Sequence, residues 1–339
     1  MKILHAPIDI GGMPFTFAQA QRELGFNAVS YVIDASPTYR FKADIQASRS
    51  TFRKRLSVKW NAIRFALQFD VFHFYFGESL TSHRLREIGL LKKLGKKVFF
   101  YFCGCDIRDS KKMISTYQYS ACRFCWPMLC SPNRDLACRV ARDQADAVFV
   151  STADLLEFVP GSIWLPQPVN LELFDSIASK VQRHKNDEEG IVLVHAPTSR
   201  AIKGSDYLIR AVDDLKAKGY KIKLCLLEKM PYKKVLEEYV KADIIVDQLL
   251  AGWYGQVSIE AMALGKPAIC YIREDLKKHA EDGLPVVSAN IDDVRDVLED
   301  LLNNRDRLAE LGQRGRAYVE KHHDARKVAE KAVEVYKNA

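Results

Sequence analysis

Two loops in the second half of the chain carry residues that suit a nucleoside diphosphate. The first, residues 194–204, follows an apolar strand and places Arg200 and Lys203 three residues apart. Cations at the carboxyl end of a parallel strand can neutralise a diphosphate leaving group, and open α/β sheets bind ligands at that edge. His195 ends the strand and is expected to lie in the same nucleotide site. An arginine and a lysine on a loop are also typical of an ordinary surface, so a second element is needed.

The second loop, residues 251–257, leads into a helix that ends at a Gly-Lys-Pro sequence. The first amides of a helix have no partner within it, and they lie at the positive end of its dipole. We therefore expect the backbone at Gly255, Gln256 and Val257 to bind a diphosphate. Glu260, one turn into the helix, can accept hydrogen bonds from ribose hydroxyls. The alternative is a plain loop and helix with a solvent-facing glutamate.

The first half of the chain offers three further candidates. Gly12 closes a two-glycine turn after the first strand, where a missing side chain lets a donor phosphate or sugar approach the backbone. His73 stands in an apolar strand and is a candidate catalytic residue, with a core histidine as the alternative. Asp106 follows another strand and is also a candidate catalytic residue, predicted to bind sugar hydroxyls and to be oriented by Arg108. An aspartate–arginine pair that caps a helix is the alternative there.

Six of the eight cysteines lie between residues 103 and 138. Cys122 and Cys125 have the Cys-x2-Cys spacing that lets two thiolates reach one tetrahedral ion. With Cys130 and Cys138 they predict a structural zinc site, although the later spacings are irregular. An iron–sulfur cluster and free thiols on an inserted loop are the alternatives.

Short apolar runs alternate with helical patterns along the whole chain, which is typical of βαβ units and parallel sheets. The predicted strands are residues 3–6, 28–32, 71–76, 98–102, 147–150, 191–195, 222–227, 244–246, 268–271 and 286–287. Residues 179–190 are polar and charged, as in a linker. The fold class is therefore α/β with two Rossmann-like domains.

These features resemble the retaining GT-B glycosyltransferases of family 4. The resemblance covers most of the chain and rests on Lys203-Gly204, residues 206–212 and residues 258–267. It implies an N-terminal acceptor domain with the cysteine-rich insertion (1–170), a C-terminal donor domain (190–316), a cleft between them, and a helix (317–339) that crosses back. It also implies that Lys203 contacts the donor phosphates and that His73 lines the acceptor pocket. Arg200 matches less well, because the arginine of the family usually lies further before the lysine.

One position departs from the family pattern. The family places a glutamate eight residues before the position of Glu260, near the transferred sugar, and this chain has Gly252 there. The resemblance still implies transfer of a sugar, with UDP-sugars favoured, to a saccharide or lipid-linked saccharide in surface glycan synthesis. The implied transfer retains configuration and needs no cofactor beyond the donor. A catalytically silent nucleotide- or glycan-binding relative and a sugar-nucleotide epimerase remain alternatives.

The composition is that of a globular protein: 339 residues, 48% hydrophobic and 28% charged, with a formal net charge of +8. The basic stretch 49–64 lacks acidic residues, and apolar residues recur in it at three- and four-residue steps. This pattern predicts an amphipathic helix that can lie on an anionic membrane, or else a core helix with a solvated face. No nucleic-acid-binding motif accompanies the charge, so no nucleic acid partner is expected. Without a signal peptide or a spanning segment, we expect a cytoplasmic protein with peripheral contact to the inner membrane face.

Overall fold

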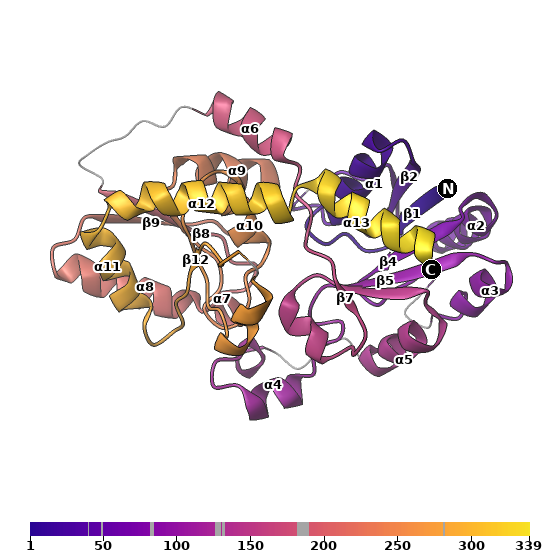
Figure 1. Ribbon diagram of the computed structural model, residues 1–339, viewed down its shortest axis with the longest axis horizontal. Helices are drawn as coiled ribbons and strands as arrows, with labels where there is room; N and C mark the ends of the chain where they lie inside the picture. Colours follow the sequence, from indigo (N-terminus) through magenta and orange to yellow (C-terminus); the bar gives the residue numbers. More distant parts are fainter. Residues whose placement is uncertain are drawn as a thin grey trace. The chain divides into compact units, whose positions relative to one another are not determined.

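The computed structural model describes residues 1–39, 41–48, 50–81, 85–125, 130, 133–181, 190–280 and 282–339. The chain divides into two compact units, each built around one sheet (Figure 1). The N-terminal unit comprises Met1–Asp109, Pro127–Pro168 and Asp324–Ala339. The C-terminal unit comprises Ser110–Trp126 and Val169–His323. The predicted α/β class with two Rossmann-like domains is confirmed.

The sheet of the N-terminal unit has seven parallel strands in the order β3-β2-β1-β4-β5-β6-β7. They are β1 (Lys2–Ala6), β2 (Asn27–Ile33), β3 (Ile45–Ala47), β4 (Val71–Tyr75), β5 (Lys97–Phe102), β6 (Ala147–Val150) and β7 (Ile163–Trp164). The sequence predicted five of them. It missed β3 and β7, which lie at the two edges and have three and two residues, too few to show an apolar pattern.

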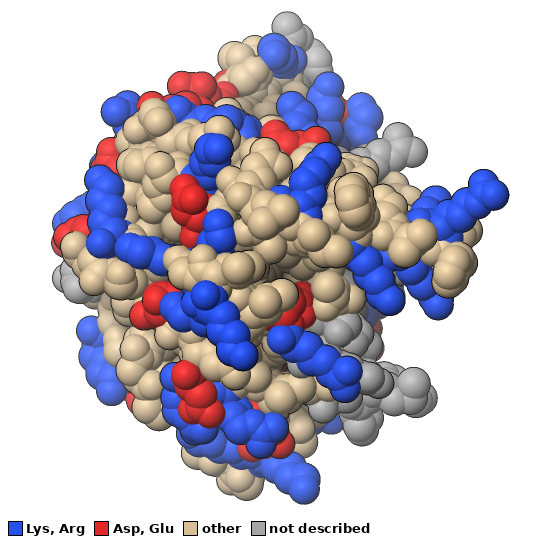
Figure 2. Space-filling view, turned by 90° about the vertical axis from the view of Figure 1, so that its right-hand side faces the viewer, with Lys and Arg blue, Asp and Glu red and all other residues tan. Residues whose placement is uncertain are grey.

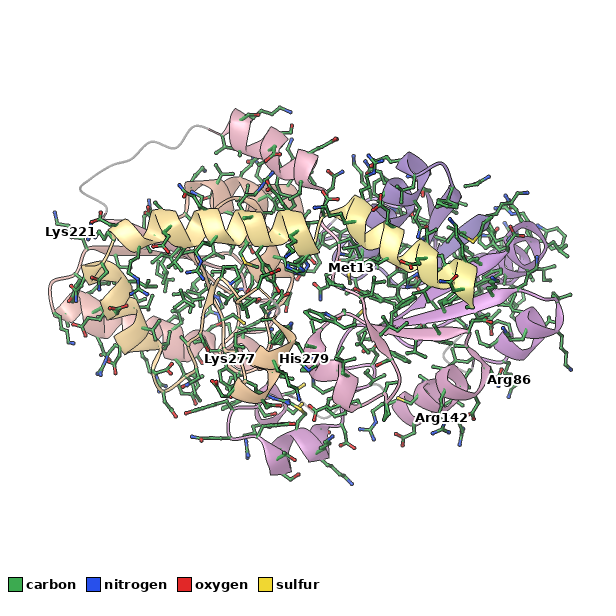
Figure 3. The ribbon with its side chains drawn as sticks, in the orientation of Figure 1. Met13, Arg86, Arg142, Lys221, Lys277 and His279 are labelled. Carbon is green, nitrogen blue, oxygen red and sulfur yellow. The ribbon has the colours of Figure 1, made fainter. Side chains whose placement is uncertain are left out.

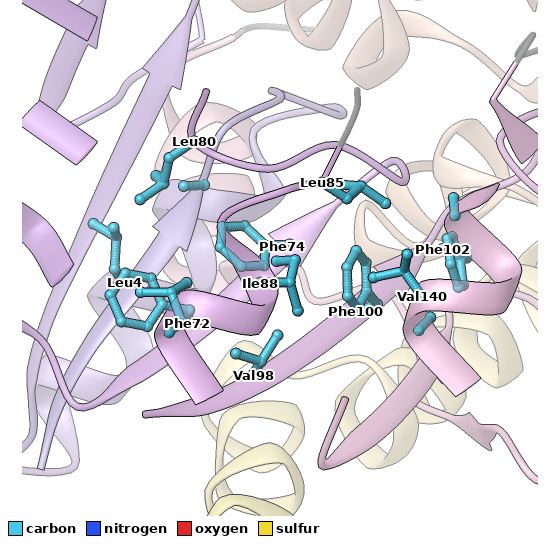
Figure 4. Close-up of a cluster of buried hydrophobic side chains, with 14 of the residues drawn as sticks. Leu4, Phe72, Phe74, Leu80, Leu85, Ile88, Val98, Phe100, Phe102 and Val140 are labelled. Carbon is cyan, nitrogen blue, oxygen red and sulfur yellow. The ribbon is translucent and has the colours of Figure 1, made fainter. Parts of the chain in front are cut away.

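Helices cover both faces of this sheet, so its strands are apolar on both sides. The helices are α1 (Met13–Glu23), α2 (Phe52–Gln68), α3 (Ile88–Lys93), α5 (Arg134–Gln144) and α13 (Ala325–Asn338), with the short η3 (Ala153–Glu157). In β4, Phe72 and Phe74 join a cluster with side chains of α2, α3 and α5 (Figure 4). Val71 and Tyr75 point the other way, into a cluster with α1 and α13.

The sheet of the C-terminal unit has five parallel strands in the order β12-β11-β10-β8-β9. They are β8 (Ile191–His195), β9 (Ile222–Leu226), β10 (Ile244–Val246), β11 (Ala268–Ile269) and β12 (Val286–Val287), and all five were predicted. The helical segments are α4 (Ser110–Thr116), η1 (Ala121–Arg123), α6 (Leu171–Lys180), α7 (Arg200–Lys203), α8 (Ser205–Ala217), α9 (Tyr232–Lys241), α10 (Gln256–Ala263), η4 (Glu274–His279), α11 (Val294–Asn303) and α12 (Asp306–His322).

Each sheet has one point where the strand order reverses. The chain leaves β1 for β2 on one side and later returns to β4 on the other, and β8 stands in the same way between β9 and β10. Open α/β sheets bind ligands outside the carboxyl ends of the strands at such a point. The loops after β1 and β4, and those after β8 and β10, are therefore where a site is expected.

The path of the chain corrects the predicted domain boundaries. The prediction placed the whole cysteine-rich insertion in the N-terminal domain, but Ser110–Trp126 belongs to the C-terminal unit. There the Ala121 N–H donates to the Leu250 carbonyl at 3.0 Å, and the Tyr119 hydroxyl donates to Asp292 at 2.7 Å. The first bond attaches the segment beside the loop that leads into α10, and the second attaches it to the turn before α11.

The predicted crossing helix 317–339 is two elements in the structure. α12 ends at His322 in the C-terminal unit, and α13 packs on α1 in the N-terminal unit. The polar stretch that predicted a linker falls largely on residues 182–189, outside the described residues. In the described part of the chain, no helix combines the length and the apolar character needed to cross a bilayer.

Candidate functional site

Lys203 lies at the reversal point of the C-terminal sheet, in the short helix α7 that follows β8. Its ammonium nitrogen lies 2.7 Å from Oδ1 of Asp247 and 2.8 Å from Oε1 of Gln248, two residues that follow β10. The Lys203 side chain is 14% exposed, and that of Asp247 is fully buried. A shielded ion pair therefore joins the two loops in which a nucleotide site was predicted.

Asp247 is the residue of this site that the sequence interpretation missed. Its Oδ2 accepts hydrogen bonds from the Gly255 N–H at 3.0 Å and from the Ser258 hydroxyl at 2.8 Å. Burial alone raises the pKa of Asp247, but the Lys203 ammonium and these donors hold it below its ordinary value. The carboxylate thus stays ionised and fixes the loop that enters α10. An aspartate directly after an apolar run, where a strand ends, could have pointed to it.

The N-terminus of α10 is organised by this carboxylate. Gly255 caps the helix, and a side-chain carbon at Gly255 would lie 3.3 Å from Oδ2 of Asp247, so the glycine permits the close approach. Gln256 and Val257 stand in the first turn, whose amides have no acceptor within the helix. The Gln256 and Val257 amides therefore lie beside the Lys203–Asp247 pair, whereas the Gly255 N–H, which was also predicted to bind a diphosphate, already donates to Asp247.

Glu260 is buried one turn further along α10, with 3% of its surface exposed. Its Oε1 accepts from the Tyr232 hydroxyl at 2.8 Å and from the Gln256 amide at 3.2 Å. Burial raises the pKa of Glu260 to about 7, although both hydrogen bonds favour the carboxylate. Near neutral pH the group is therefore close to half protonated, and hydroxyl donors from a ligand would favour its charged form.

Two predicted donor-site residues make other contacts. His195 is buried, and its Nδ1 and Nε2 lie 2.8 Å from the Val246 carbonyl oxygen and 2.8 Å from the Ser205 hydroxyl. Burial lowers the pKa of His195 to about 4, so it is neutral and links β8 to α8. Arg200 is exposed and forms a two-pronged ion pair with Glu228 at 2.9 and 2.6 Å.

Gly252, where the family has a glutamate, is closed in by Arg273. Its φ is +84°, and a side-chain carbon there would lie 2.7 Å from Cδ of Arg273. The Arg273 guanidinium is held by Asp275 at 3.0 and 2.7 Å and lies 3.6 Å from the centre of the Tyr117 ring. The loop therefore depends on a glycine packed against a buried arginine. A larger residue at position 252 would displace the Arg273 side chain.

Gly12 lies in the loop after β1, at the reversal point of the N-terminal sheet. Its φ is +77°, and its N–H donates to Oδ1 of Asp9 at 2.8 Å. Burial raises the pKa of Asp9 to about 6 despite that bond. The next residue, Met13, begins α1 (Figure 3). Gly12 is thus in the predicted type of turn, in the unit that does not contain Lys203.

His73 is completely buried in β4. Its Nδ1 is hydrogen-bonded to the Tyr336 hydroxyl of α13, and its ring stacks on that of Tyr75 with centroids 4.9 Å apart. Burial lowers the pKa of His73 well below its ordinary value. This placement favours the core histidine over the predicted catalytic one.

Asp106 is also buried, in the turn that follows β5. It accepts from the backbone N–H of Cys103 at 3.0 Å and of Gly104 at 2.6 Å, and burial raises its pKa to about 6. Arg108 forms an ion pair with the buried Asp154, with its Nη2 at 2.6 Å. The bonds of Asp106 shape the turn, which favours a structural role over the predicted catalytic one.

The four cysteines of the predicted zinc site are divided between the units. Cys122 and Cys125 belong to the C-terminal unit, and Cys130 and Cys138 to the N-terminal unit. Within the described ranges, no three His, Cys, Asp or Glu side chains are grouped so that they could hold a metal ion. The zinc site stays a prediction.

Comparison with known proteins shows similarity to glycosyltransferases. Residues 208–334 match the family model described as "Glycosyl transferase-like". A D-inositol 3-phosphate glycosyltransferase of Nocardia farcinica (strain IFM 10152) is 28% identical over 132 residues, which are 38% of this chain. The match spans only 29% of the length of that relative.

Solved structures resemble the chain over its whole length. Sucrose-phosphate synthase from Thermosynechococcus elongatus has a TM-score of 0.67 at 15% identity, covering 100% of this chain and 99% of that one. The Anabaena protein HepE in complex with UDP has a TM-score of 0.65 at 12% identity, with 100% of both chains covered. The fold is thus that of the GT-B glycosyltransferases, and the predicted resemblance to glycosyltransferases is confirmed.

Proposed function

We propose that this protein transfers a sugar from a nucleoside diphosphate sugar, with UDP-sugars favoured, to a saccharide or lipid-linked saccharide acceptor in surface glycan synthesis. The transfer retains the configuration at the sugar carbon. The observation that carries the proposal is the shielded Lys203–Asp247 ion pair beside the N-terminus of α10, with Glu260 one turn further along. Two proteins that this chain resembles support it, because one is a glycosyltransferase and the other was solved in complex with UDP.

Each part of this constellation has a task in the proposed reaction. The Lys203 ammonium and the first amides of α10 stabilise the charge that develops on the departing diphosphate. Asp247 holds both in place before the ligand arrives, so little reorganisation is needed. Glu260 accepts hydrogen bonds from the ribose hydroxyls. Since these groups supply positive charge without a metal ion, we expect turnover to persist in a chelator.

The silent relative remains the second candidate because of Gly252 and Arg273. The guanidinium of Arg273 is buried beside a position where the family has a carboxylate. This change leaves the nucleotide-binding residues intact and affects the environment of the sugar. Binding of a nucleotide and transfer of a sugar must therefore be measured separately.

The first test is a thermal-shift titration with UDP, GDP, ADP and their sugar conjugates. A nucleotide at 100 times its dissociation constant stabilises the folded state by about 2.7 kcal/mol, which raises the melting temperature measurably. We expect Lys203→Ala and Glu260→Gln to remove the shift. The matched control is Lys218→Gln, which removes an exposed lysine paired with Glu299.

The outcomes separate the candidates. A shift that depends on Lys203 and Glu260, followed by release of nucleotide when acceptor is added, supports the transferase. The same shift without turnover on any acceptor supports the silent relative. Absence of a shift with every nucleotide at millimolar concentration would overturn the assignment of the donor site.

A further inference from the structure

Helix α2 exposes an unusual row of large apolar side chains. Eleven such side chains are exposed in the part of the chain that the structure describes, and five of them lie on α2. They are Phe52 (81%), Leu56 (58%), Trp60 (68%), Ile63 (59%) and Leu67 (76%). No other described helix carries more than two of the remaining six. Isolated exposed apolar residues are normal, but a contiguous row marks a surface that binds something.

The row is separate from the face by which α2 packs on its own unit. At about 100° per residue, the five exposed residues fall within an arc of about 80°. The buried residues Val58, Ala62 and Phe65 lie on the opposite side of the helix and belong to the core. The Phe65 ring meets that of Tyr31 at 5.0 Å between centroids. The core therefore already holds the helix, and the outer row is not needed for that purpose.

Basic residues border the apolar row on both sides. At about 100° per residue, Arg53 and Arg64 lie along one side of the row, and Lys59 and Arg55 lie along the other side. No acidic residue occurs in Phe52–Gln68. Figure 2 looks onto the end of the N-terminal unit that carries α2, and Lys and Arg dominate the charged groups in view.

We propose that α2 is a membrane-binding surface that inserts this apolar row into the interface of an anionic bilayer. A helix with apolar residues on one strip and cations along its borders lies in the plane of such an interface, with the cations at the lipid phosphates. A second copy of the chain fits less well, because α2 against α2 would bring like charges together along the whole helix. The inference concerns the N-terminal unit and does not depend on the proposed transfer reaction.

The test is sedimentation of the full chain with vesicles of phosphatidylcholine alone and of an equimolar mixture with phosphatidylglycerol. We expect binding to the anionic vesicles only, and weaker binding as salt rises and screens the charges. The apolar variant is Leu56→Gln with Trp60→Gln. The basic variant is Arg53→Gln with Lys59→Gln and Arg64→Gln, and removal of each charge lowers the partition coefficient about fivefold.

Control variants change exposed apolar and exposed basic side chains outside α2. Ile114→Gln with Leu173→Gln removes two exposed apolar side chains, and Lys216→Gln with Lys233→Gln removes two exposed charges. The melting temperature of each protein checks its fold, which the exposed positions on α2 leave intact. Sedimentation velocity without lipid tests for a dimer through α2.

The proposal holds if both α2 variants lose binding to anionic vesicles and the controls keep it. Equal sedimentation of the wild type with neutral and anionic vesicles, or α2 variants that bind like the controls, would overturn it. A wild-type dimer that becomes monomeric in the apolar variant, with no vesicle binding in either, would overturn it in favour of self-association. If a nucleotide still raises the melting temperature of the α2 variants, their loss of vesicle binding is independent of the proposed nucleotide site.

Discussion

Glu260 is deeply buried, although its proposed contact with ribose hydroxyls favours the charged form of the carboxyl group. The carboxyl group lies among the side chains of α9 and α10 with two hydrogen-bond donors, and burial still raises its pKa to about 7 from an ordinary 4.5. The folded protein therefore holds a proton on Glu260 at pH values where the unfolded chain has lost it. Ligand hydroxyls that favour the carboxylate would release that proton on binding.

This proton predicts a pH dependence of stability. Between pH 4.5 and about 7 the folded state binds more protons than the unfolded state at Glu260. The free energy of unfolding therefore falls as the pH rises through that window, and by linkage the loss is about 3 kcal/mol. In Glu260→Gln this contribution is absent. Denaturant titrations from about pH 5 to about pH 8 should show the wild type losing stability relative to the variant.

The comparison with the variant isolates Glu260 from other groups that titrate in the same range. Burial also raises the pKa values of Asp9 and Asp106 to about 6, but both groups are the same in the two proteins. Parallel stability curves for wild type and Glu260→Gln would show that the carboxyl group titrates normally, and that its environment is more polar than the structure indicates.

Lys203 and Asp247 show which parts of the site the sequence could reveal. A lysine beside a glycine after a strand is a local pattern, and it predicted Lys203 and the loop. Asp247 is separated from Lys203 by 44 residues, and its role depends on β10 lying next to β8 in the sheet. The burial of His73 by α13 is likewise a tertiary property, because Tyr336 lies 263 residues further along the chain. No pattern within one segment shows it.

At the scale of elements, α10 is supported by the unusually close approach of α12. Gly312 of α12 passes the C-terminal end of α10, where a side-chain carbon would lie 2.0 Å from the Gly265 carbonyl oxygen. At Gly315, one turn further, such a carbon would lie 2.9 Å from Cγ of Met262. The two glycines let α12 pack on the helix that carries Glu260.

Gly312→Ala is therefore expected to destabilise the protein, although alanine favours a helix by about 1 kcal/mol over glycine. The added methyl group would meet a backbone oxygen, and α12 would have to move away from α10. We expect a net loss of about 2 kcal/mol in the free energy of unfolding, measured by denaturant titration. Gln313→Ala, at an exposed position of the same helix, is the matched control and should change stability by less than about 0.5 kcal/mol. Equal stabilities of the two variants would contradict the close packing.

The central strands were predictable and the edge strands were not, for a physical reason. β4 and β5 are buried on both faces, so nearly every residue in them is apolar and the pattern is continuous. β3 and β7 are held by pairing with a neighbour, and their few residues carry no periodicity. The same reasoning applies to Ser110–Trp126, whose place in the C-terminal unit rests on bonds to Leu250 and Asp292.

At the scale of the whole molecule, the chain passes repeatedly between its two units. The last segment, Asp324–Ala339, returns to the N-terminal unit, where α13 covers the sheet face next to α1. Tyr336 is fully buried there, its hydroxyl bonds to His73, and its carbonyl oxygen accepts from the Lys97 ammonium at 2.9 Å. The core of the N-terminal unit therefore includes residues from the very end of the printed sequence.

Tyr336→Ala tests whether α13 stabilises that unit in particular. The substitution leaves a cavity against Phe99, whose ring centre lies 4.5 Å from that of Tyr336, and leaves His73 buried without its partner. Such losses cost about 4 kcal/mol. Hydrogen exchange followed by mass spectrometry should show reduced protection in β1, β4 and β5. Strands β8 and β10 belong to the other unit and should keep theirs, because their core contains no residue of α13.

Lys331→Ala, an exposed position on the same helix, should leave both patterns unchanged. Equal loss of protection in both sheets would mean that the two units unfold together, and that the chain end stabilises the molecule as a whole rather than the sheet it covers.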